Sequence, residues 1–249
     1  MIRGIYTSTS ALDLQEIKQE VWANNIANLD TPGFKKELIW AEAAQETNIF
    51  RFLGSQSPYP LGEMTAGVQP GTEKITDFSP GTLEETGNYL DLAIEGNGFF
   101  VVSTPSGEAY TRAGNFQLDG EGRLITVSGY PVLGEGGEIV LPAGGKASID
   151  EEGNISVDGE EVDRLRIVDF ADRSVIRKNG ENLFVAEGVA PQEAINFRVR
   201  QGFLEKSNLD PIEAMVSMIE ALREYEIAQR MLISQDEALQ KAVNNIAQA

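Results

Sequence analysis

The sequence predicts an α+β protein in which one helix at each end of the chain brackets a β-rich middle. The prediction rests on a long heptad stripe near the C-terminus, a shorter helical segment at the N-terminus, and short strand-like runs separated by glycine-containing turns. The C-terminal stripe is expected to be a coiled-coil seam, because alternating spacings of three and four residues keep one face against a partner helix. The middle is expected to form a sandwich-like or barrel-like central domain.

The N-terminal helix is expected over residues 3–28, since no Gly or Pro interrupts this segment after Gly4. It should stop before residues 30–33, Asp-Thr-Pro-Gly, because proline disfavours helix at the preceding residue and Pro-Gly suits a type II turn. Its apolar stripe continues into polar residues at the same spacing, through Leu14, Ile17, Val21, Asn24 and Asn28.

Residues 34–89 are expected to form an extended or hairpin linker region. The part from 34 to 46 is compatible with a helix or with an extended strand that begins near Phe34, Leu38 and Trp40. Residues 54–73 are rich in Gly and Pro, which favours a linker or a long hairpin over a regular helix.

The β-rich central domain is expected over residues 90–207. Leu90, Leu92 and Ile94 alternate with polar or small neighbours, and Gly96-Asn97-Gly98 is expected to turn a hairpin into a strand at 99–102. Turn sequences then recur at short intervals. Further short strands are expected at 139–141, 147–149, 155–157, 165–170 and 182–185.

The C-terminal helix has a clear start. Asp210 is a good N-cap, Pro211 suits the first helical position, and Glu213 follows three residues after the cap. A helix that continues to Ile246 would be about 54 Å long, which exceeds what a domain of this size covers with its own core. We therefore favour packing against another chain over packing into the protein's own core. The stripe comprises Met215, Met218, Leu222, Tyr225, Gln229, Leu232, Asp236, Leu239, Val243 and Ile246.

The two helical ends, residues 1–33 and 208–249, are predicted to form one terminal domain that carries the contacts between subunits. Asn-Asn-Ile-Ala occurs at 24–27 and again at 244–247, which suggests similar surroundings for both ends. The candidate assembly residues are Leu14, Ile17, Val21, Asn24, Asn25, Asn28, Met215, Met218, Leu222, Tyr225, Leu232, Leu239, Val243 and Ile246.

The composition excludes several kinds of function. Acidic residues number 39 against 20 basic ones, for a net charge of -19, so neither nucleic acid nor an anionic membrane is an expected partner. The chain has no Cys and no His, which excludes thiolate and imidazole chemistry. No apolar run reaches the ~20 residues that cross a bilayer, and residues 1–20 do not resemble a cleaved secretory signal, so the default location is the cytoplasm. Neither a metal nor a cofactor is expected.

Three motifs of the sequence have a chemical explanation and a structural one. Gly96-Asn97-Gly98 lacks the third glycine and the following helix of a phosphate loop. The acidic stretches at 150–154 and 158–161 lack the spacing of a calcium loop and suit exposed turns. A pair of catalytic carboxylates would make the chain a carbohydrate-active β enzyme with a helical oligomerisation arm, and a dimeric binding module is a further alternative.

Residues 24–35 read Asn-Asn-Ile-Ala-Asn-Leu-Asp-Thr-Pro-Gly-Phe-Lys. Three more blocks are Leu-Asp-Leu-Ala-Ile-Glu-Gly-Asn-Gly-Phe-Phe-Val-Val at 90–102, Tyr-Thr-Arg-Ala-Gly-Asn-Phe at 110–116 with Ser-Gly-Tyr-Pro-Val at 128–132, and Gly-Phe-Leu-Glu-Lys-Ser-Asn at 202–208, which runs into 215–220 and 223–226. In this order the blocks resemble the bacterial flagellar rod and hook family. Among its members they resemble rod proteins of the distal type or the similar proximal type.

The resemblance implies a structural, non-catalytic subunit without a cofactor. Its terminal helices would pair in an inner coiled-coil layer inside a β domain, and it would assemble into a helical tube that transmits motor torque. Its partners would be other copies of itself and neighbouring rod and hook subunits. The resemblance also implies export through the flagellar type III apparatus without a cleaved signal, and a final place in the periplasmic rod of the basal body.

Overall fold

The structure is a computed structural model that describes residues 2–43, 46–51, 59–65, 68–142, 144–186 and 188–247. The chain divides into two compact units. Unit 1 comprises Met1–Ile26, Glu37–Ile75 and Asp210–Ala249, and unit 2 comprises Ala27–Lys36 and Thr76–Leu209. The domain boundaries predicted at 33, 89 and 207 stay a prediction.

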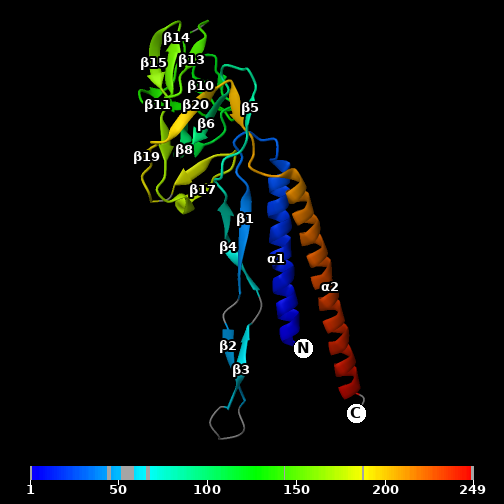
Figure 1. Cartoon of the computed structure of the whole chain (residues 1–249). Coiled ribbons are helices and arrows are strands. Elements are labelled where there is room, and N and C mark those ends of the chain that lie inside the picture. Colours follow the sequence, from blue (N-terminus) through cyan, green and yellow to red (C-terminus); the bar gives the residue numbers. More distant parts are fainter. Residues whose placement is uncertain are drawn as a thin grey trace. The chain divides into compact units, whose positions relative to one another are not determined.

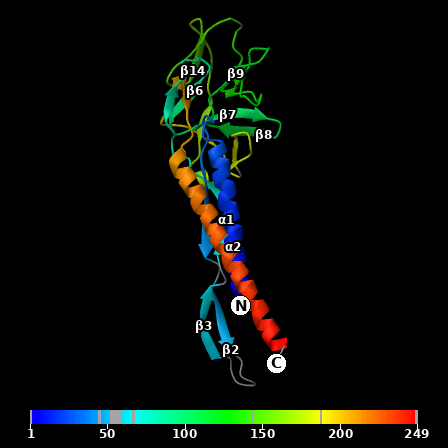
Figure 2. The same ribbon diagram turned by 90° about the vertical axis from the view of Figure 1, so that its right-hand side faces the viewer.

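Unit 1 contains the two long helices. Helix α1 spans Ile2–Ala27 and α2 spans Pro211–Ala247, so both predicted helices are confirmed to within about a residue at each end. They run side by side in opposite directions, with the two termini at the same end of the unit (Figures 1 and 2). Together with the β-rich middle, this confirms the α+β class.

The segment between α1 and unit 2 forms strands. β1 (Glu37–Ala43) pairs with β4 (Val68–Thr76), and β2 (Glu46–Arg51) pairs antiparallel with β3 (Tyr59–Thr65). The strand alternative for residues 34–46 is therefore confirmed from Glu37 onwards, as is the hairpin alternative for the described part of 54–73. The predictions at 44–45, 52–58 and 66–67 lie outside the described residues.

Unit 2 is built on a six-stranded sheet with several small sheets around it. The order in the large sheet is β17 (Ile176–Lys178), β18 (Phe184–Ala186), β8 (Gly107–Thr111), β7 (Phe99–Thr104), β16 (Ile167–Asp169) and β19 (Gln192–Glu193). A three-stranded sheet contains β13 (Ala147–Ile149), β14 (Asn154–Val157) and β15 (Glu160–Arg164). The two-stranded pairs are β20 (Phe197–Gln201) with β6 (Leu92–Gly96), β21 (Phe203–Glu205) with β5 (Leu83–Glu85), β10 (Leu124–Ile125) with β9 (Gln117–Leu118), and β11 (Leu133–Gly134) with β12 (Gly137–Glu138). One short 3-10 helix covers Arg173–Val175.

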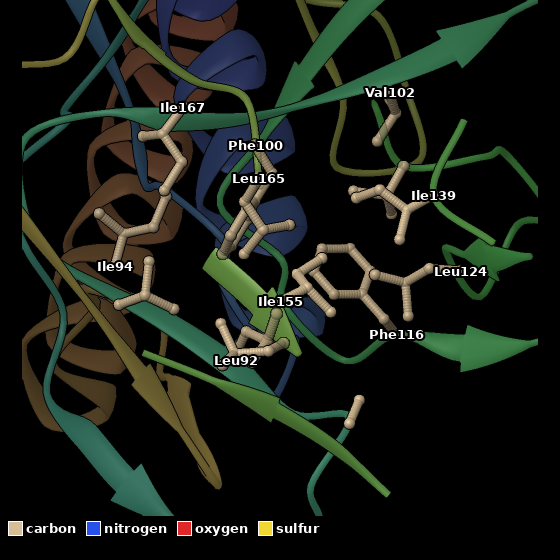
Figure 3. Close-up of a cluster of buried hydrophobic side chains, with 14 of the residues drawn as sticks. Leu92, Ile94, Phe100, Val102, Phe116, Leu124, Ile139, Ile155, Leu165 and Ile167 are labelled. Carbon is tan, nitrogen blue, oxygen red and sulfur yellow. The ribbon is translucent and has the colours of Figure 1, made fainter. Parts of the chain in front are cut away.

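Strand β7 runs through the middle of the core of unit 2. Successive side chains of a strand point to opposite faces, so Phe100 and Val102 enter the larger apolar cluster while Phe99 and Val101 enter the smaller one. All four are at most 1% exposed. Figure 3 shows the larger cluster, in which Phe100 and Phe116 meet edge to face with ring centroids 5.1 Å apart. A strand buried on both faces explains the unbroken apolar run at 99–102.

The hairpin predicted at Gly96-Asn97-Gly98 is wrong. β6 pairs with β20, whereas β7 pairs with β8 and β16, so the turn passes the chain from one sheet to another. Gly96 and Gly98 have φ angles of 103° and 138°. A Cβ on Gly96 would lie 2.5 Å from the Asn196 carbonyl oxygen, so the glycines permit a close passage beside another strand.

The other strand predictions fare unevenly. The strands at 147–149 and 155–157 are confirmed. The predicted strand at 165–170 contains the shorter β16, and the predicted strand at 182–185 overlaps β18. The strand at 139–141 is wrong, because the structure gives this segment only one isolated bridge, from Val140 to Arg123. Ile139 and Leu141 are nevertheless buried in the core. The apolar spacing identified buried residues correctly there but not their pairing.

Candidate assembly interface

Helix α2 starts at the predicted cap. The Asp210 carboxylate accepts hydrogen bonds from the backbone N–H groups of Ile212, at 2.8 Å, and Glu213, at 3.1 Å. Pro211 has no N–H, so it leaves no unpaired donor in the first turn. The cap fixes where the helix begins and therefore which residues fall on each of its faces.

The buried face of α2 is lined by small side chains. Ala214, Ala221 and Ala228 are 0%, 3% and 7% exposed, and they recur every seven residues. The half-buried side chains on the same face are Met218, Tyr225, Leu232, Gln235 and Leu239. This face keeps the alternating spacing of three and four residues. Ala214, Ala221, Ala228 and Gln235 occupy it in place of the predicted Met215, Leu222, Gln229 and Asp236.

The remaining members of the predicted stripe are exposed. Met215 is 53% exposed, Leu222 43% and Val243 62%, and the side chain of Ile246 lies outside the described residues. Near the start of α2 an exposed apolar surface, which we call the outer face, comprises Ile212, Met215, Val216, Ile219 and Leu222. A contiguous exposed apolar patch of this kind marks a binding surface more often than a solvated one.

Helix α1 packs along the alanine face of α2. Lys18 Nζ lies 3.4 Å from Glu224 Oε2, and a Cβ on Gly4 would lie 2.8 Å from Gln235 Oε1. Gly4 lies opposite Gln235. Because the helices are antiparallel, Ala11, seven residues after Gly4, lies opposite Ala228, seven residues before Gln235. Small residues on both sides allow the two helices to approach closely.

The packing around α1 and α2 leaves polar atoms unpaired. Gln15 Oε1, Gln19 Nε2 and Gln235 Oε1 are buried without a hydrogen-bond partner among the described residues. A buried polar atom that loses water and gains no partner costs about 1–3 kcal/mol. These unpaired atoms lower the stability of the packing in a single chain.

A groove of about 250 Å³ lies between α1, β1 and α2. Its apolar lining includes Val21, which is 2% exposed, and Leu38, which is 37% exposed. The remaining lining residues are Lys18, Trp22, Glu37, Ile39, Ser217, Glu220, Ala221 and Glu224.

Asn25 joins the end of α1 to the start of β1. Its side-chain Nδ2 donates to the Glu37 carbonyl oxygen at 2.8 Å, and its Oδ1 accepts from the Glu37 N–H at 2.9 Å. The side chain is 0% exposed. Asn25 therefore bonds within its own chain. Asn24 is exposed, and Asn28 accepts a hydrogen bond from Thr31 Oγ1 at 3.3 Å.

The apolar residues of α1 that were predicted to mediate assembly are largely covered within the single chain, and their role in assembly stays a prediction. Leu14 and Val21 are buried and Ile17 is half-buried.

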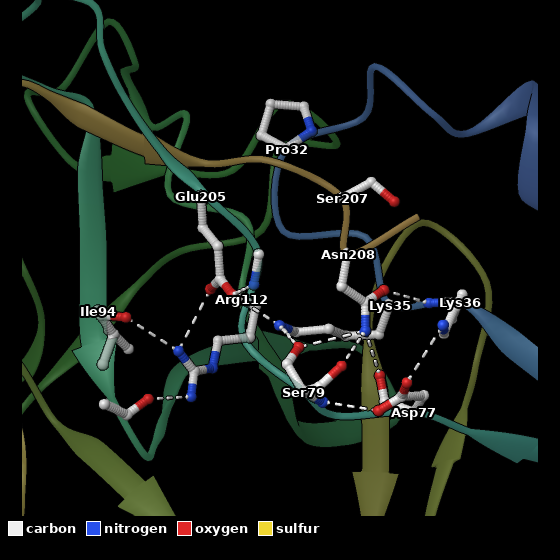
Figure 4. Close-up of polar contacts among 12 residues, drawn as sticks. Pro32, Lys35, Lys36, Asp77, Ser79, Ile94, Arg112, Glu205, Ser207 and Asn208 are labelled. Carbon is white, nitrogen blue, oxygen red and sulfur yellow. Dashed lines mark hydrogen bonds and ion pairs between the residues drawn. The ribbon is translucent and has the colours of Figure 1, made fainter. Parts of the chain in front are cut away.

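The loop that follows α1 is anchored in unit 2 by a buried ion cluster (Figure 4). Lys35 Nζ lies 2.6 Å from Glu205 Oε1 and 2.7 Å from the Ser79 carbonyl oxygen. Arg112 Nη1 donates to Glu205 Oε2 at 3.2 Å, and the Gly81 N–H donates to Glu205 Oε1 at 2.9 Å. The Lys35 and Glu205 side chains are each 1% exposed and Arg112 is 3% exposed.

The cluster holds two cations and one carboxylate. Burial lowers the pKa of the Lys35 ammonium, and Arg112 adds to this shift, while Glu205 opposes it. Burial also lowers the pKa of Arg112, again against Glu205. Glu205 is the common partner of both cations, so it is the residue on which the cluster depends.

Two further residues shape this loop. Gly33 has φ of 67°, and a Cβ there would lie 2.3 Å from the Arg112 carbonyl carbon. Asn182, also in the left-handed region at φ of 58°, donates from Nδ2 to the Pro32 carbonyl oxygen at 2.8 Å. The backbone of residues 32–35 is thereby fixed from both sides.

The sequence signalled parts of this arrangement. Residues 24–35 and 202–208 were both recognised as motifs, but nothing local connects Lys35 to Glu205. The pattern of large apolar residues does not predict the alanine face, whereas the recurrence of alanine every seven residues would indicate it. Within the described ranges, no group of three or more acidic side chains could hold a metal ion. None of the described helices has both the length and the apolar character to cross a membrane.

Comparison with known families matches three parts of the chain. Residues 5–35 match the family described as flagella basal body rod protein, and residues 93–157 match the flagellar hook protein FlgE/F/G D1 domain. Residues 200–246 match the flagellar basal body rod FlgEFG protein C-terminal family. The first and last of these contain the two partners of the buried ion pair, Lys35 and Glu205.

Relatives match over nearly the whole chain. The flagellar basal-body rod protein FlgG of Bacillus subtilis is 35% identical, over 98% of this chain and 99% of the relative. The flagellar basal-body rod protein FlgF of Caulobacter vibrioides is 34% identical, over 99% of this chain and 98% of the relative. FlgF of Salmonella typhimurium is 34% identical over 95% of each chain.

Proposed function

Since this chain belongs to the family of flagellar basal-body rod proteins and is a structural subunit of the rod rather than an enzyme, we propose that it polymerises with copies of itself through the helices of unit 1. The observation that carries this proposal is the outer face of α2, where five large apolar side chains are between 43% and 75% exposed. Burying one such side chain contributes about 1.5–3 kcal/mol, before the entropy of ordering is subtracted.

We further infer that α1 and α2 belong to an inner coiled-coil layer. The buried face of α2 alternates spacings of four and three residues, as a coiled coil requires. The unpaired amide atoms of Gln15 and Gln235 support an arrangement in which the helices become fully ordered only in the polymer. Interlocked helices in such a layer would resist twisting, which a rod that transmits torque needs.

The route and final place of the protein follow from the family resemblance. We infer export through the flagellar type III apparatus without a cleaved signal, and a working position in the periplasmic rod between neighbouring rod and hook subunits. The chain in purified basal bodies should have the same N-terminus as the chain retained in the cytoplasm. A shorter N-terminus, determined by mass spectrometry, would contradict export without cleavage.

Leu222→Asp tests the proposal. A carboxylate on the outer face would be buried and unpaired in each subunit of the polymer, so rods should be absent or short in a deletion strain that carries this variant. Leu239→Asp, on the half-buried face of α2, should act in the same direction. Rods would be counted by electron microscopy of basal bodies.

Val127→Asp is the matched control, because Val127 is 63% exposed on unit 2. It should leave rod number and length unchanged. Normal rods with Leu222→Asp would show that the outer face does not mediate assembly.

A further inference from the structure

We propose that the groove between α1, β1 and α2 receives the outer face of α2 from a second copy of this chain. This rests on the proposed function, and it adds the site on the neighbouring subunit that the outer face occupies. The groove and the outer face both belong to unit 1, so the same unit carries both halves of the contact.

The groove and the outer face are different surfaces of α2, and their centres lie on different sides of the helix. The helix advances about 100° per residue, so residues two positions apart differ by about 200° around its axis. Ile219 and Leu222 on the outer face stand two positions from Ala221 and Glu224 of the groove. A contact from one side of a helix to the other side of its copy cannot be isologous. It therefore adds subunits in one direction without closing on itself as a pair does.

The shapes of the two surfaces suit each other. The groove offers apolar surface from Trp22, Leu38 and Ile39 beside a space of about 250 Å³. Leu222 and Ile219 protrude from the outer face, 43% and 48% exposed. One or two large aliphatic side chains fit a space of this size.

The charges also match. The groove carries three carboxylates, from Glu37, Glu220 and Glu224, against one cation, Lys18, which already lies 3.4 Å from Glu224. Arg223 also lies on the outer face. It follows Leu222 directly and stands one helical turn after Ile219. Arg223 is exposed and has no ion-pair partner among the described residues. An arginine beside protruding aliphatic groups is the complement of an apolar groove with an acidic margin.

Disulfide trapping tests the pairing directly, because the chain has no cysteine of its own. The double variant Leu38→Cys with Ile219→Cys should give a ladder of cross-linked oligomers in basal bodies isolated after mild oxidation. Either single variant alone should give only monomer, and co-expression of the two single variants should give dimers and no longer products. Val127→Cys with Ile219→Cys is the matched control and should give no ladder. Dimers from Ile219→Cys alone would indicate an isologous contact and overturn the proposal.

A mixed-subunit experiment provides a second, independent test. Arg223→Glu and Glu220→Arg should each reduce rod number at least tenfold when expressed alone. Co-expressed, the two variants should restore rods, because each outer face then meets a groove of opposite charge on the other variant. Restoration cannot come from a pair within one helix, since each variant carries like charges at positions 220 and 223.

The two tests separate this inference from the proposed function. If Leu222→Asp assembles normally, the outer face itself is not used and both ideas fail. If Leu222→Asp blocks assembly while no ladder forms and the mixture is no better than its components, the outer face binds elsewhere and only the groove assignment is overturned.

Discussion

The side-chain amide of Asn25 takes both backbone hydrogen bonds of Glu37, as a neighbouring strand would. The last turn of α1 is thereby joined to the first residue of β1 at a fully buried position. This pairing explains why an amide, with a donor and an acceptor on one planar group, occupies a fully buried position.

Replacing Asn25 with Leu should destabilise unit 1. The substitution removes the two hydrogen bonds that the Asn25 amide makes to the Glu37 backbone, at about 0.5–1.5 kcal/mol for each bond. Loss of helical circular dichroism with urea should therefore occur at a clearly lower concentration in Asn25→Leu than in the wild type. Asn24→Leu is the control, because Asn24 is exposed and should change the midpoint little. Equal effects of the two substitutions would contradict the assigned hydrogen bonds.

Replacing Glu205 with Gln should destabilise unit 2 by about 3–5 kcal/mol, since it leaves the Lys35 and Arg112 charges buried without a counter-charge. Glu84→Gln removes the carboxylate of an exposed pair with Lys206 and should cost less than about 1 kcal/mol. Denaturant unfolding, followed by the near-ultraviolet circular dichroism of the Phe and Tyr residues, would measure both losses. A similar loss in the two variants would show that the buried cluster is not charged as described.

The stability of unit 2 should rise with pH in the alkaline range because of Lys35. Its pKa is lowered in the folded state from 10.5, chiefly by burial, so between the folded value and 10.5 the unfolded chain binds more protons. The burial penalty of the charge is fully present below the folded pKa and is relieved as pH rises to 10.5.

Lys35→Met isolates this contribution. The free energy of unfolding of the wild type, minus that of Lys35→Met, should increase through the alkaline window below 10.5 and then level off. A difference that stays constant with pH would show that Lys35 is not buried with a lowered pKa.

Replacing Gly33 or Gly87 with Ala separates backbone strain from steric exclusion. The two glycines have nearly the same φ, 67° and 71°. A Cβ on Gly33 meets the Arg112 backbone, whereas a Cβ on Gly87 meets nothing within 4 Å. Gly87→Ala should cost about 1 kcal/mol from the left-handed conformation alone, and Gly33→Ala should cost several times more. Thermal unfolding of the two variants would measure this difference, and equal melting temperatures would place residue 33 away from Arg112.

Amide hydrogen exchange in the monomer should distinguish the two ends of α2. The last fully buried side chain on the described part of the helix is Ala228, so the described side chains beyond 228 are at most half-buried. The backbone amides there should exchange fast, while residues 99–102 of β7 should exchange slowly. Slow exchange throughout α2 in a confirmed monomer would mean that the helix is fully ordered before assembly.

Local patterns predicted the helices well. The Asp210 cap, the proline at the first position and the three-four spacing all act within a few residues, so they are visible in the sequence. The same holds for the strands at 147–149 and 155–157, which alternate across a short hairpin. Relations over long distances were not predictable. β6 pairs with β20, about a hundred residues later in the chain, and Lys35 forms its ion pair with Glu205. Tertiary packing rather than local propensity determines such partners.

The heptad stripe of α2 illustrates a different limit. Large apolar residues identified Met215 and Leu222, yet these face outwards while alanines fill the contact with α1. In a subunit that assembles, large apolar side chains can pack against a neighbouring subunit, while small side chains pack within the subunit's own fold. Periodicity of large residues therefore indicates the existence of a helix and of a contact surface, but not which helix occupies it.

The pairing of Lys35 with Glu205 also sets the order in which the chain can mature. Unit 2 needs residues 27–36 at one end of its sequence and β21 at the other, 170 positions apart along the chain. A chain that emerges from the ribosome with its N-terminus first therefore cannot pair Lys35 with Glu205 until 170 further residues have appeared. Contacts between such distant residues form slowly. The buried cluster closes only when β21 arrives with the carboxylate that Lys35 and Arg112 require.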